Sequence, residues 1–213
     1  MKKPLADLLE LLDLEPIEMN LFRGVSPDEG WQRVYGGQVI GQALVAAYRT
    51  VEDPDRIAHS LHGYFLRPGD TQCPILYQVD RIRDGRSFTT RRVKAIQKGE
   101  AIFSMSASFH VNEKDLEHQI DAPVSPEPAD CRSEDSLIEE YCKAYPDEKN
   151  DLLKRARPIE MRYVNPVNEI DPEPLPPEQS VWIRTVDTMP DDLRLNQCLL
   201  AYASDMTLID TSY

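Results

Sequence analysis

One uncharged stretch, residues 36–48, constrains the fold of this chain more than any other part of the sequence. It reads GGQVIGQALVAAY and contains neither proline nor a charged residue. At 3.6 residues per turn its apolar side chains go right round the helix, a pattern typical of a helix buried on most sides. The stretch is shorter than the ~20 apolar residues that span a bilayer. It therefore predicts a soluble core helix that is wrapped by other elements.

The segment that follows this helix predicts the wrapping elements. Four strands are expected over residues 57–66, 75–83, 87–97 and 101–111, with hairpin turns at Asp84-Gly85 and Lys98-Gly99. In the last strand apolar and polar side chains alternate, apart from Ile102, so one face packs on the helix and the other is mostly polar. One long helix against an antiparallel meander is an α+β arrangement known as the hot-dog fold.

A second uncharged, proline-free helix is expected over residues 195–204, LNQCLLAYAS, with Asp192 as its cap and a strand over 181–186 before it. Because this order resembles the first half, the chain is interpreted as a diverged internal repeat, a double hot-dog. The expected division has three parts: a first hot-dog domain over 1–115, a proline-rich connector over 116–180, and the start of a second hot-dog domain over 181–213. The connector is expected to hold one helix, 134–144, capped by Ser133, and an extended segment, 159–164.

The second helix is followed by far less sequence than the first. After Tyr48 there are 63 residues of strand and turn up to and including Val111, whereas only eight residues follow Asp205. The second hot-dog copy is therefore expected to be truncated after its helix, which would leave apolar surface bare. Because large bare apolar patches promote association, we expect a homo-oligomer.

Composition narrows the possible partners and the compartment. The net charge of −13 argues against a nucleic-acid partner, since binding to phosphates depends on Lys and Arg. The four cysteines are scattered, with no CxxC, which indicates reduced thiols in a cytoplasmic protein and no zinc site. Three acidic residues interrupt the N-terminal apolar run, so no secretory signal and no membrane span are expected.

Asp205 is the strongest candidate for a site residue. It ends the second uncharged run, and on a helix it would lie within about 20° of Cys198 and about 40° of Ala201. Burying a carboxylate on such an apolar face is costly, so a carboxylate there is a candidate for function. The alternative is that Asp205 ends the helix and caps the next turn, and spacing alone leaves both interpretations open.

Several sequence blocks resemble the acyl-CoA thioesterase II family, the TesB-type enzymes with a double hot-dog fold. In the family's order they are LFRG (21–24), YGGQVIGQAL (35–44), HSLHGYFLRPGD (59–70), RDGRSFTTRRV (83–93), VWIR (181–184), PDDLR (190–194) and YASD (202–205). The resemblance implies hydrolysis of fatty acyl-CoA to free acid and CoA, without a metal or organic cofactor. It also implies an Asp–Thr–Gln set that activates one water, with Asp205 as its Asp.

The sequence departs from the family pattern after Asp205. In the family the Thr and Gln lie well beyond the Asp, and Thr207 and Thr211 are too close to Asp205 to match the Thr. One of the three catalytic side chains is therefore present, and we expect this chain alone to hydrolyse acyl-CoA far more slowly than a longer form.

Thioester chemistry is consistent with so small a site. The leaving thiolate has a pKa near ~8.5, so it departs with little acid help. A carboxylate base with orienting donors can then suffice, and the chain contains no GxSxG nucleophile elbow. Backbone N–H groups at Gly36, Gly37 and the start of the second helix are candidate oxyanion donors.

Gln38, His59 and Arg91 complete the candidates for substrate binding. Gln38 could line an acyl tunnel or satisfy a buried carbonyl, and the second is favoured. His59, with His62, offers too few ligands for zinc, so a polar strand position near the site is favoured. Arg91 belongs to a basic cluster that could meet CoA phosphates, although a solvated strand edge is favoured.

Two other functions stay open beside the thioesterase. One is an acyl-CoA-binding or interaction module without turnover, because the site is incomplete. The other, less favoured, is a hot-dog hydratase or dehydratase. Hydratases of this fold use an Asp–His pair near the helix, and the sequence places no such pair around Asp205.

Overall fold

The computed structural model describes residues 1–27, 32–114, 116–146, 157–171 and 173–208. The chain divides into two compact units. The main unit comprises Leu8–Leu116 and Met189–Met206; the small unit contains Met1–Asp7, Glu117–Thr188 and the segment from Thr207. Over the described ranges, no helix is long and apolar enough to cross a membrane.

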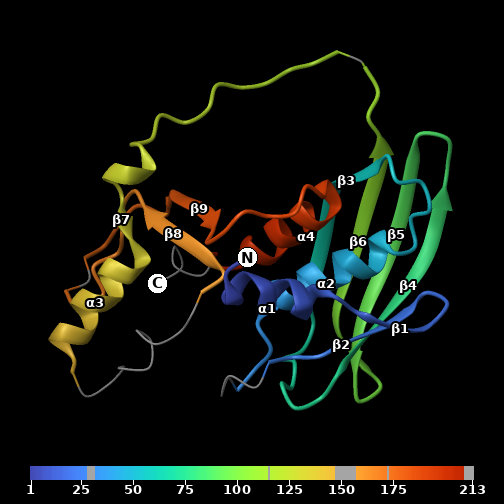
Figure 1. Cartoon of the computed structure of the whole chain (residues 1–213), viewed down its shortest axis with the longest axis horizontal. Coiled ribbons are helices and arrows are strands. Elements are labelled where there is room, and N and C mark those ends of the chain that lie inside the picture. Colours follow the sequence, from blue (N-terminus) through green and yellow to red (C-terminus); the bar gives the residue numbers. More distant parts are fainter. Residues whose placement is uncertain (28–31, 115, 147–156, 172, 209–213) are drawn as a thin grey trace. The chain divides into compact units, whose positions relative to one another are not determined.

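Helix α2 (Gly36–Tyr48) lies against a six-stranded sheet in the main unit (Figure 1). Every neighbouring pair of strands in this sheet is antiparallel. The sheet order is β1-β2-β4-β5-β6-β3, for β1 (Glu15–Glu18), β2 (Leu21–Gly24), β3 (Arg56–Phe65), β4 (Ile75–Asp84), β5 (Phe88–Gln97) and β6 (Glu100–Val111). The expected α+β hot-dog arrangement is therefore confirmed. Strand β1 was not expected; it contains Pro16 at the sheet edge, where a missing N–H is tolerated.

The core of the main unit lies between α2 and the facing side of the sheet. From the helix it takes Val39, Ala43, Leu44, Ala46 and Ala47, all almost fully buried. The strands contribute alternate residues, Val93 and Ala95 from β5 and Phe103, Met105, Ala107 and Phe109 from β6. The all-round apolar pattern of α2 and the alternation in β6 thus have the cause that the sequence predicts.

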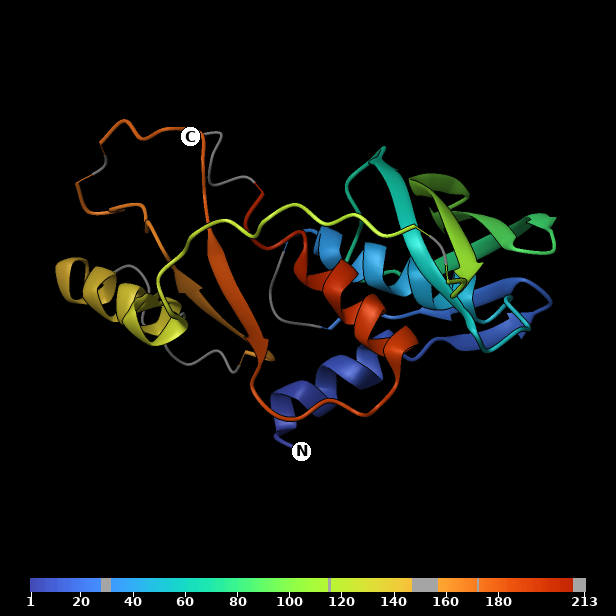
Figure 2. The same ribbon diagram turned by 90° about the horizontal axis from the view of Figure 1, so that it is seen from above.

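Helix α4 (Leu193–Ala203) packs alongside α2, as Figure 2 shows from above. Two glycines on α2 allow this approach: a Cβ on Gly37 would lie 2.2 Å from the Tyr202 carbonyl oxygen, and one on Gly41 would lie 3.3 Å from that of Cys198. The expected cap is confirmed, because the Leu195 N–H donates to Asp192 Oδ1 at 3.1 Å.

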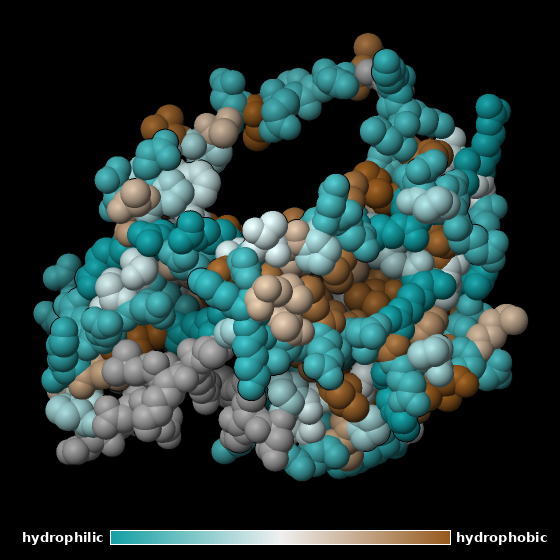
Figure 3. Space-filling view, viewed as in Figure 1, coloured by the Kyte–Doolittle hydropathy of each residue, from teal (hydrophilic) through white to brown (hydrophobic). Residues whose placement is uncertain are grey.

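The outward side of α4 carries apolar surface, as the sequence predicts. Leu193 and Leu200 are both exposed, Leu200 by 59%. On β3 and just beyond it, Tyr64, Phe65 and Leu66 are exposed as well. Figure 3 shows hydrophobic surface gathered around α4 and β3.

The small unit is built on a three-stranded antiparallel sheet in the order β7-β8-β9. Its strands are β7 (Arg132–Ser133), β8 (Ile159–Tyr163) and β9 (Val181–Thr185). The other elements are helix α3 (Glu134–Ala144) and the short 3₁₀ helix η1 (Pro128–Asp130), while α1 (Lys3–Leu12) opens the chain. Ser133 caps α3 by accepting the Ser136 N–H, which confirms the predicted helix start. The division of the chain at residues 115 and 180 stays a prediction.

Candidate active site

Asp205 lies just beyond α4 and meets the N-terminal end of α2. Its carboxylate comes so close to Gly36 that a Cβ there would lie 2.5 Å from Oδ2. The backbone N–H of Gly37 donates a hydrogen bond to the same carboxylate. The first turn of a helix has unpaired N–H groups and partial positive charge, so this position suits an anion. Three of the predicted residues, Asp205, Gly36 and Gly37, therefore come together.

The environment of Asp205 makes its carboxylate more basic. Burial raises the pKa of Asp205 above its ordinary value of 3.8, and the hydrogen bond from Gly37 opposes this rise without cancelling it. A base with a raised pKa accepts a proton from water more readily once it is ionised. The arrangement can therefore position a water molecule and take its proton.

Tyr35 lies near this carboxylate, and Tyr202 packs against Tyr35. The Tyr35 hydroxyl donates to the Tyr202 carbonyl oxygen at 3.0 Å, and their rings meet edge to face at 5.1 Å. Burial, and then the charge of Asp205, raise the pKa of Tyr35 above its ordinary value of 10. The Tyr35 hydroxyl therefore stays protonated near neutral pH, so it is not a proton acceptor as the Asp205 carboxylate can be.

The alternative role of Asp205, capping the turn that follows it, stays a prediction, because residues 209–210 of that turn lie outside the described part of the chain. The carboxylate accepts its backbone hydrogen bond from Gly37, across the helix pair. Tyr35, at the N-cap position of α2, makes no side-chain capping bond. Asp205 thus caps α2 from another part of the chain.

Asp205→Asn should raise the stability of the folded chain at neutral pH. The pKa of Asp205 is higher in the folded than in the unfolded state, so the folded state binds the proton more tightly. Ionisation therefore destabilises the fold above both pKa values, and this cost disappears as the pH falls below the unfolded value of ~3.9. In urea unfolding, the free energy of unfolding of the Asn variant should exceed that of wild type at pH 7. The difference between the two should narrow towards pH 4. A less stable Asn variant at pH 7 would contradict the raised pKa.

Gln38 is buried and has a structural role. Its Nε2 donates to the Val25 carbonyl oxygen and to Ser26 Oγ, both at 3.1 Å. One turn further, Gln42 accepts a hydrogen bond from the Tyr77 hydroxyl at 2.7 Å. These contacts match the favoured interpretation, in which Gln38 satisfies a buried carbonyl. Substrate contact by Gln38 stays a prediction.

His59 lies apart from the Asp205 group. Ala58, the residue before His59, packs on the core. His59 Nε2 lies 2.8 Å from the hydroxyl of Ser108. The neighbours of Ser108 on β6, Ala107 and Phe109, are buried, so Ser108 lies on the opposite face of the strand. His59 also meets the rings of Phe88 and His110. These contacts place it on the outer face of the sheet, away from α2. Burial, and then His110, lower the pKa of His59 below its ordinary 6.5.

Arg91 corrects one expectation, because it does not lie on a solvated strand edge. It is 1% exposed, on a central strand of the sheet. Its guanidinium donates to Thr50 Oγ1 at 2.8 Å, to the Thr50 carbonyl oxygen at 2.9 Å and to Asp84 at 2.6 Å. The carbonyl oxygens of Arg83 and Thr90 take further bonds. Arg91 thus ties the end of α2 to the sheet, and its donors are engaged inside the protein.

Arg91→Met should destabilise the chain by roughly 2–4 kcal/mol. The change breaks a partly buried ion pair and leaves the Thr50 carbonyl without its partner. Arg92→Ala is the matched control, because the neighbouring side chain is exposed and should change stability by less than about 0.5 kcal/mol. Chemical unfolding of both variants checks the difference. Equal stabilities would show that the buried network contributes little.

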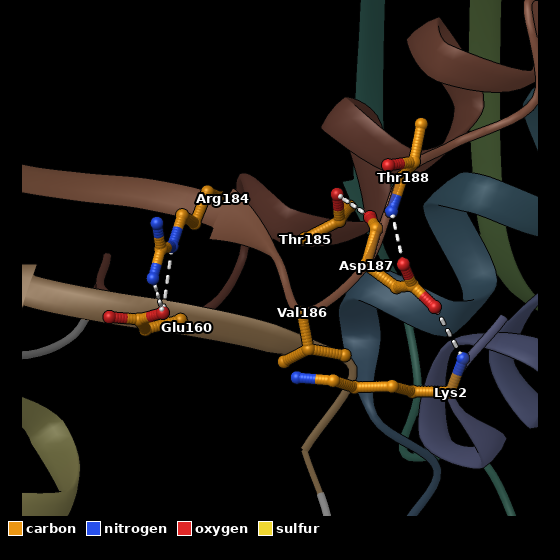
Figure 4. Close-up of a pocket in the computed structure, with 7 residues that line it drawn as sticks. All are labelled: Lys2, Glu160, Arg184, Thr185, Val186, Asp187 and Thr188. Carbon is orange, nitrogen blue, oxygen red and sulfur yellow. Dashed lines mark hydrogen bonds and ion pairs between the residues drawn. The ribbon is translucent and has the colours of Figure 1, made fainter.

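The small unit contains a polar hollow of about 400 Å³, shown in Figure 4. In it the Arg184 guanidinium pairs with Glu160 at 2.6 Å, and the Lys2 N–H donates to Asp187 at 2.6 Å. The hydrogen bond from Arg184 lowers the pKa of Glu160. The pKa of Asp187 is lowered chiefly by the hydrogen bond from the Thr188 N–H. Neither group is therefore prepared to act as a base. The hollow is lined by Lys2, Glu160, Arg184, Thr185, Val186, Asp187 and Thr188.

Among the residues that the structure describes, no cluster of three or more His, Cys, Asp or Glu side chains could hold a metal ion. Sequence reasoning did not single out Tyr35 or Phe65, although both lie beside Asp205 or Gly36. The sequence signal for both residues was their position inside the family-like blocks, 35–44 for Tyr35 and 59–70 for Phe65.

Comparisons with known proteins agree over most of the chain. Residues 27–110 match the family described as "Acyl-CoA thioesterase N-terminal domain", and residues 150–213 match "Acyl-CoA thioesterase". Acyl-CoA thioesterase 2 of Haemophilus influenzae is 43% identical, over 98% of this chain and 72% of that protein. Acyl-coenzyme A thioesterase 8 of Mus musculus is 39% identical, over 95% of this chain and 66% of that protein.

Solved structures give the same result. The crystal structure of acyl-CoA thioesterase II TesB2 from Mycobacterium marinum is 41% identical and superimposes with a TM-score of 0.72, over 97% of this chain and 69% of that one. The tesB protein of Mycobacterium avium subs paratuberculosis is 31% identical, with a TM-score of 0.76, over 98% of this chain and 72% of that one.

Proposed function

The chain belongs to the acyl-CoA thioesterase family, and we propose that it hydrolyses acyl-CoA thioesters with Asp205 as the base. The supporting observation is the half-buried Asp205 carboxylate, held against the first turn of α2 by the Gly37 N–H. A carboxylate made more basic by burial, beside a helix N-terminus, combines a proton acceptor with a region that favours negative charge.

In the proposed reaction Asp205 takes a proton from a water molecule as the water oxygen forms a bond to the thioester carbonyl carbon. The carbonyl electron pair moves onto its oxygen, and backbone N–H groups at the start of α2 would stabilise that charge. The C–S bond then breaks as the carbonyl re-forms. The CoA thiolate leaves and takes up the proton, directly or from solvent, and the free acid remains.

Release of free thiol from a fatty acyl-CoA tests this function. No Thr or Gln after Asp205 matches the family's water-orienting pair, so the 213-residue chain should be compared with a fusion. The fusion continues into the part of the H. influenzae relative beyond the aligned segment. We expect the fusion to hydrolyse acyl-CoA and the unfused chain to be far slower. Strong turnover by the unfused chain would overturn the proposed need for the pair.

The second candidate function is an acyl-CoA-binding module without turnover. It is favoured if the folded fusion binds acyl-CoA in calorimetry yet releases no thiol. A hydratase is not supported by the geometry, because His59 and His110 pair with each other on the outer face of the sheet. Neither supplies the His partner of Asp205 that such an enzyme uses.

We also propose that the protein is a cytoplasmic homo-oligomer that takes acyl-CoA and no nucleic acid. The exposed apolar side chains of β3 and α4 would be covered by association. Cys73, Cys131 and Cys198 form no disulfide, as a reducing compartment favours. Light scattering tests the assembly, and a monodisperse monomer at high concentration would count against it.

A further inference from the structure

We infer that Phe65 is a positioning residue for Asp205, whose ring holds the carboxylate against the start of α2 and keeps water from one side of it. This inference rests on the proposed role of Asp205 as the base.

The ring of Phe65 and the carboxylate of Asp205 both lie beside the α carbon of Gly36. A Cβ built on Gly36 would lie 2.5 Å from Asp205 Oδ2 and 2.8 Å from Phe65 Cζ. Both side chains therefore use the space that Gly36 leaves empty. The tip of an aromatic ring beside a carboxylate oxygen fills a place that water would otherwise occupy.

The core holds this ring in place. The Phe65 ring packs on the Phe103 ring with a centroid distance of 4.9 Å, and Phe103 is 1% exposed. Phe103 itself fits because Gly63 has no side chain, since a Cβ there would lie 2.5 Å from Phe103 Cζ. A pair of tilted aromatic rings thus connects the sheet to the site.

The exposure of Phe65 also suggests more than packing. The residue is 53% exposed, so much of its apolar surface gains nothing from burial in the fold. Its ring tip nevertheless lies against Gly36, at the position that the Asp205 carboxylate also approaches. Burial is the largest cause of the raised pKa of Asp205, and under this inference the ring supplies part of that burial.

Carboxyl ¹³C NMR of the 213-residue chain tests the inference by titrating Asp205, with Asp205→Asn identifying its signal. Phe65→Ala should lower the pKa of Asp205 towards 3.8. Phe65→Leu should lower it too, because Leu can contact Phe103 but is too short to reach Gly36. Phe65→Met should retain the wild-type value, because its longer apolar chain can reach. Leu66→Ala, which removes an equally exposed neighbour, should also leave the pKa unchanged.

In the fusion, Phe65→Ala should lower kcat about tenfold and move the acid limb of the pH–rate profile to lower pH. Rescue of both by Phe65→Met separates positioning from a general loss of packing. If the Ala variant does not fold, the Leu variant carries the test. An unchanged pKa of Asp205 in a folded Ala or Leu variant would overturn the inference. The titration needs no turnover, so it tests the role of Phe65 separately from the proposed function. Failure of the proposed function would be shown instead by activity retained in the Asp205→Asn variant.

Discussion

Asp205→Asn in the fusion should lower kcat for acyl-CoA hydrolysis at least ~10²-fold, because a positioned base typically supplies ~10²–10⁴. Asparagine has the same shape and can still accept the Gly37 N–H, so α2 keeps its cap. Only the ability to take a proton from water is lost. Substrate binding should therefore change little, and calorimetry with a non-hydrolysable acyl-CoA analogue checks this.

Asp192→Asn is the matched control for this change. Asp192 caps the start of α4, and asparagine is an equally good cap. The same carboxylate-to-amide change at the other end of one helix should leave activity and stability almost unchanged. Undiminished hydrolysis by the Asp205 variant would remove this carboxylate from the mechanism.

Gly37→Ala should destabilise the chain by about 3 kcal/mol or more. The new Cβ would lie 2.2 Å from the Tyr202 carbonyl oxygen and 2.4 Å from Tyr35 Cε1. The first atom belongs to the backbone, so relief requires α2 and α4 to separate, and forced overpacking costs about 1–3 kcal/mol or occasionally more. The movement would also pull the Gly37 N–H away from Asp205, so hydrolysis by the fusion should fall as well.

Gly41→Ala, one turn further along α2, provides the comparison. Its Cβ would meet Leu12 Cδ2 at 3.0 Å and the Cys198 carbonyl oxygen at 3.3 Å, contacts that small shifts relieve. Alanine also gains about 1 kcal/mol of helix propensity over glycine, so the variant should stay close to wild type. Thermal and urea unfolding measure both variants. Equal stabilities would show that the close approach at Gly37 does not limit the helix pair.

The elements of the main unit could be predicted because local patterns determine them. An uncharged run has only one stable position, inside the core, and α2 occupies it. The alternation in β6 likewise fixes its inner face. Strand β1 was missed because Pro16 resembles a helix stop, and its pairing depends on a neighbouring strand.

The site could be predicted only in part. Asp205 stays a prediction, which rests on a charge at the end of an apolar run and on the resemblance of YASD to the family. Arg91 was misplaced because its partners, Thr50 and Asp84, are distant in sequence, so its buried network has no local signal. The meeting of Phe65 with Gly36 depends on how strand and helix are juxtaposed, which no spacing within either element reveals.

The pH dependence of kcat/KM for the fusion, measured beside its Asp205→Asn variant, tests most directly whether Asp205 is the base. A base acts when deprotonated, so the wild-type rate should rise with pH and level off above the pKa of Asp205, which burial places above 3.8. The slower Asn variant should show no such limb. The same acid limb in both proteins would contradict the account, because another group would then supply the base.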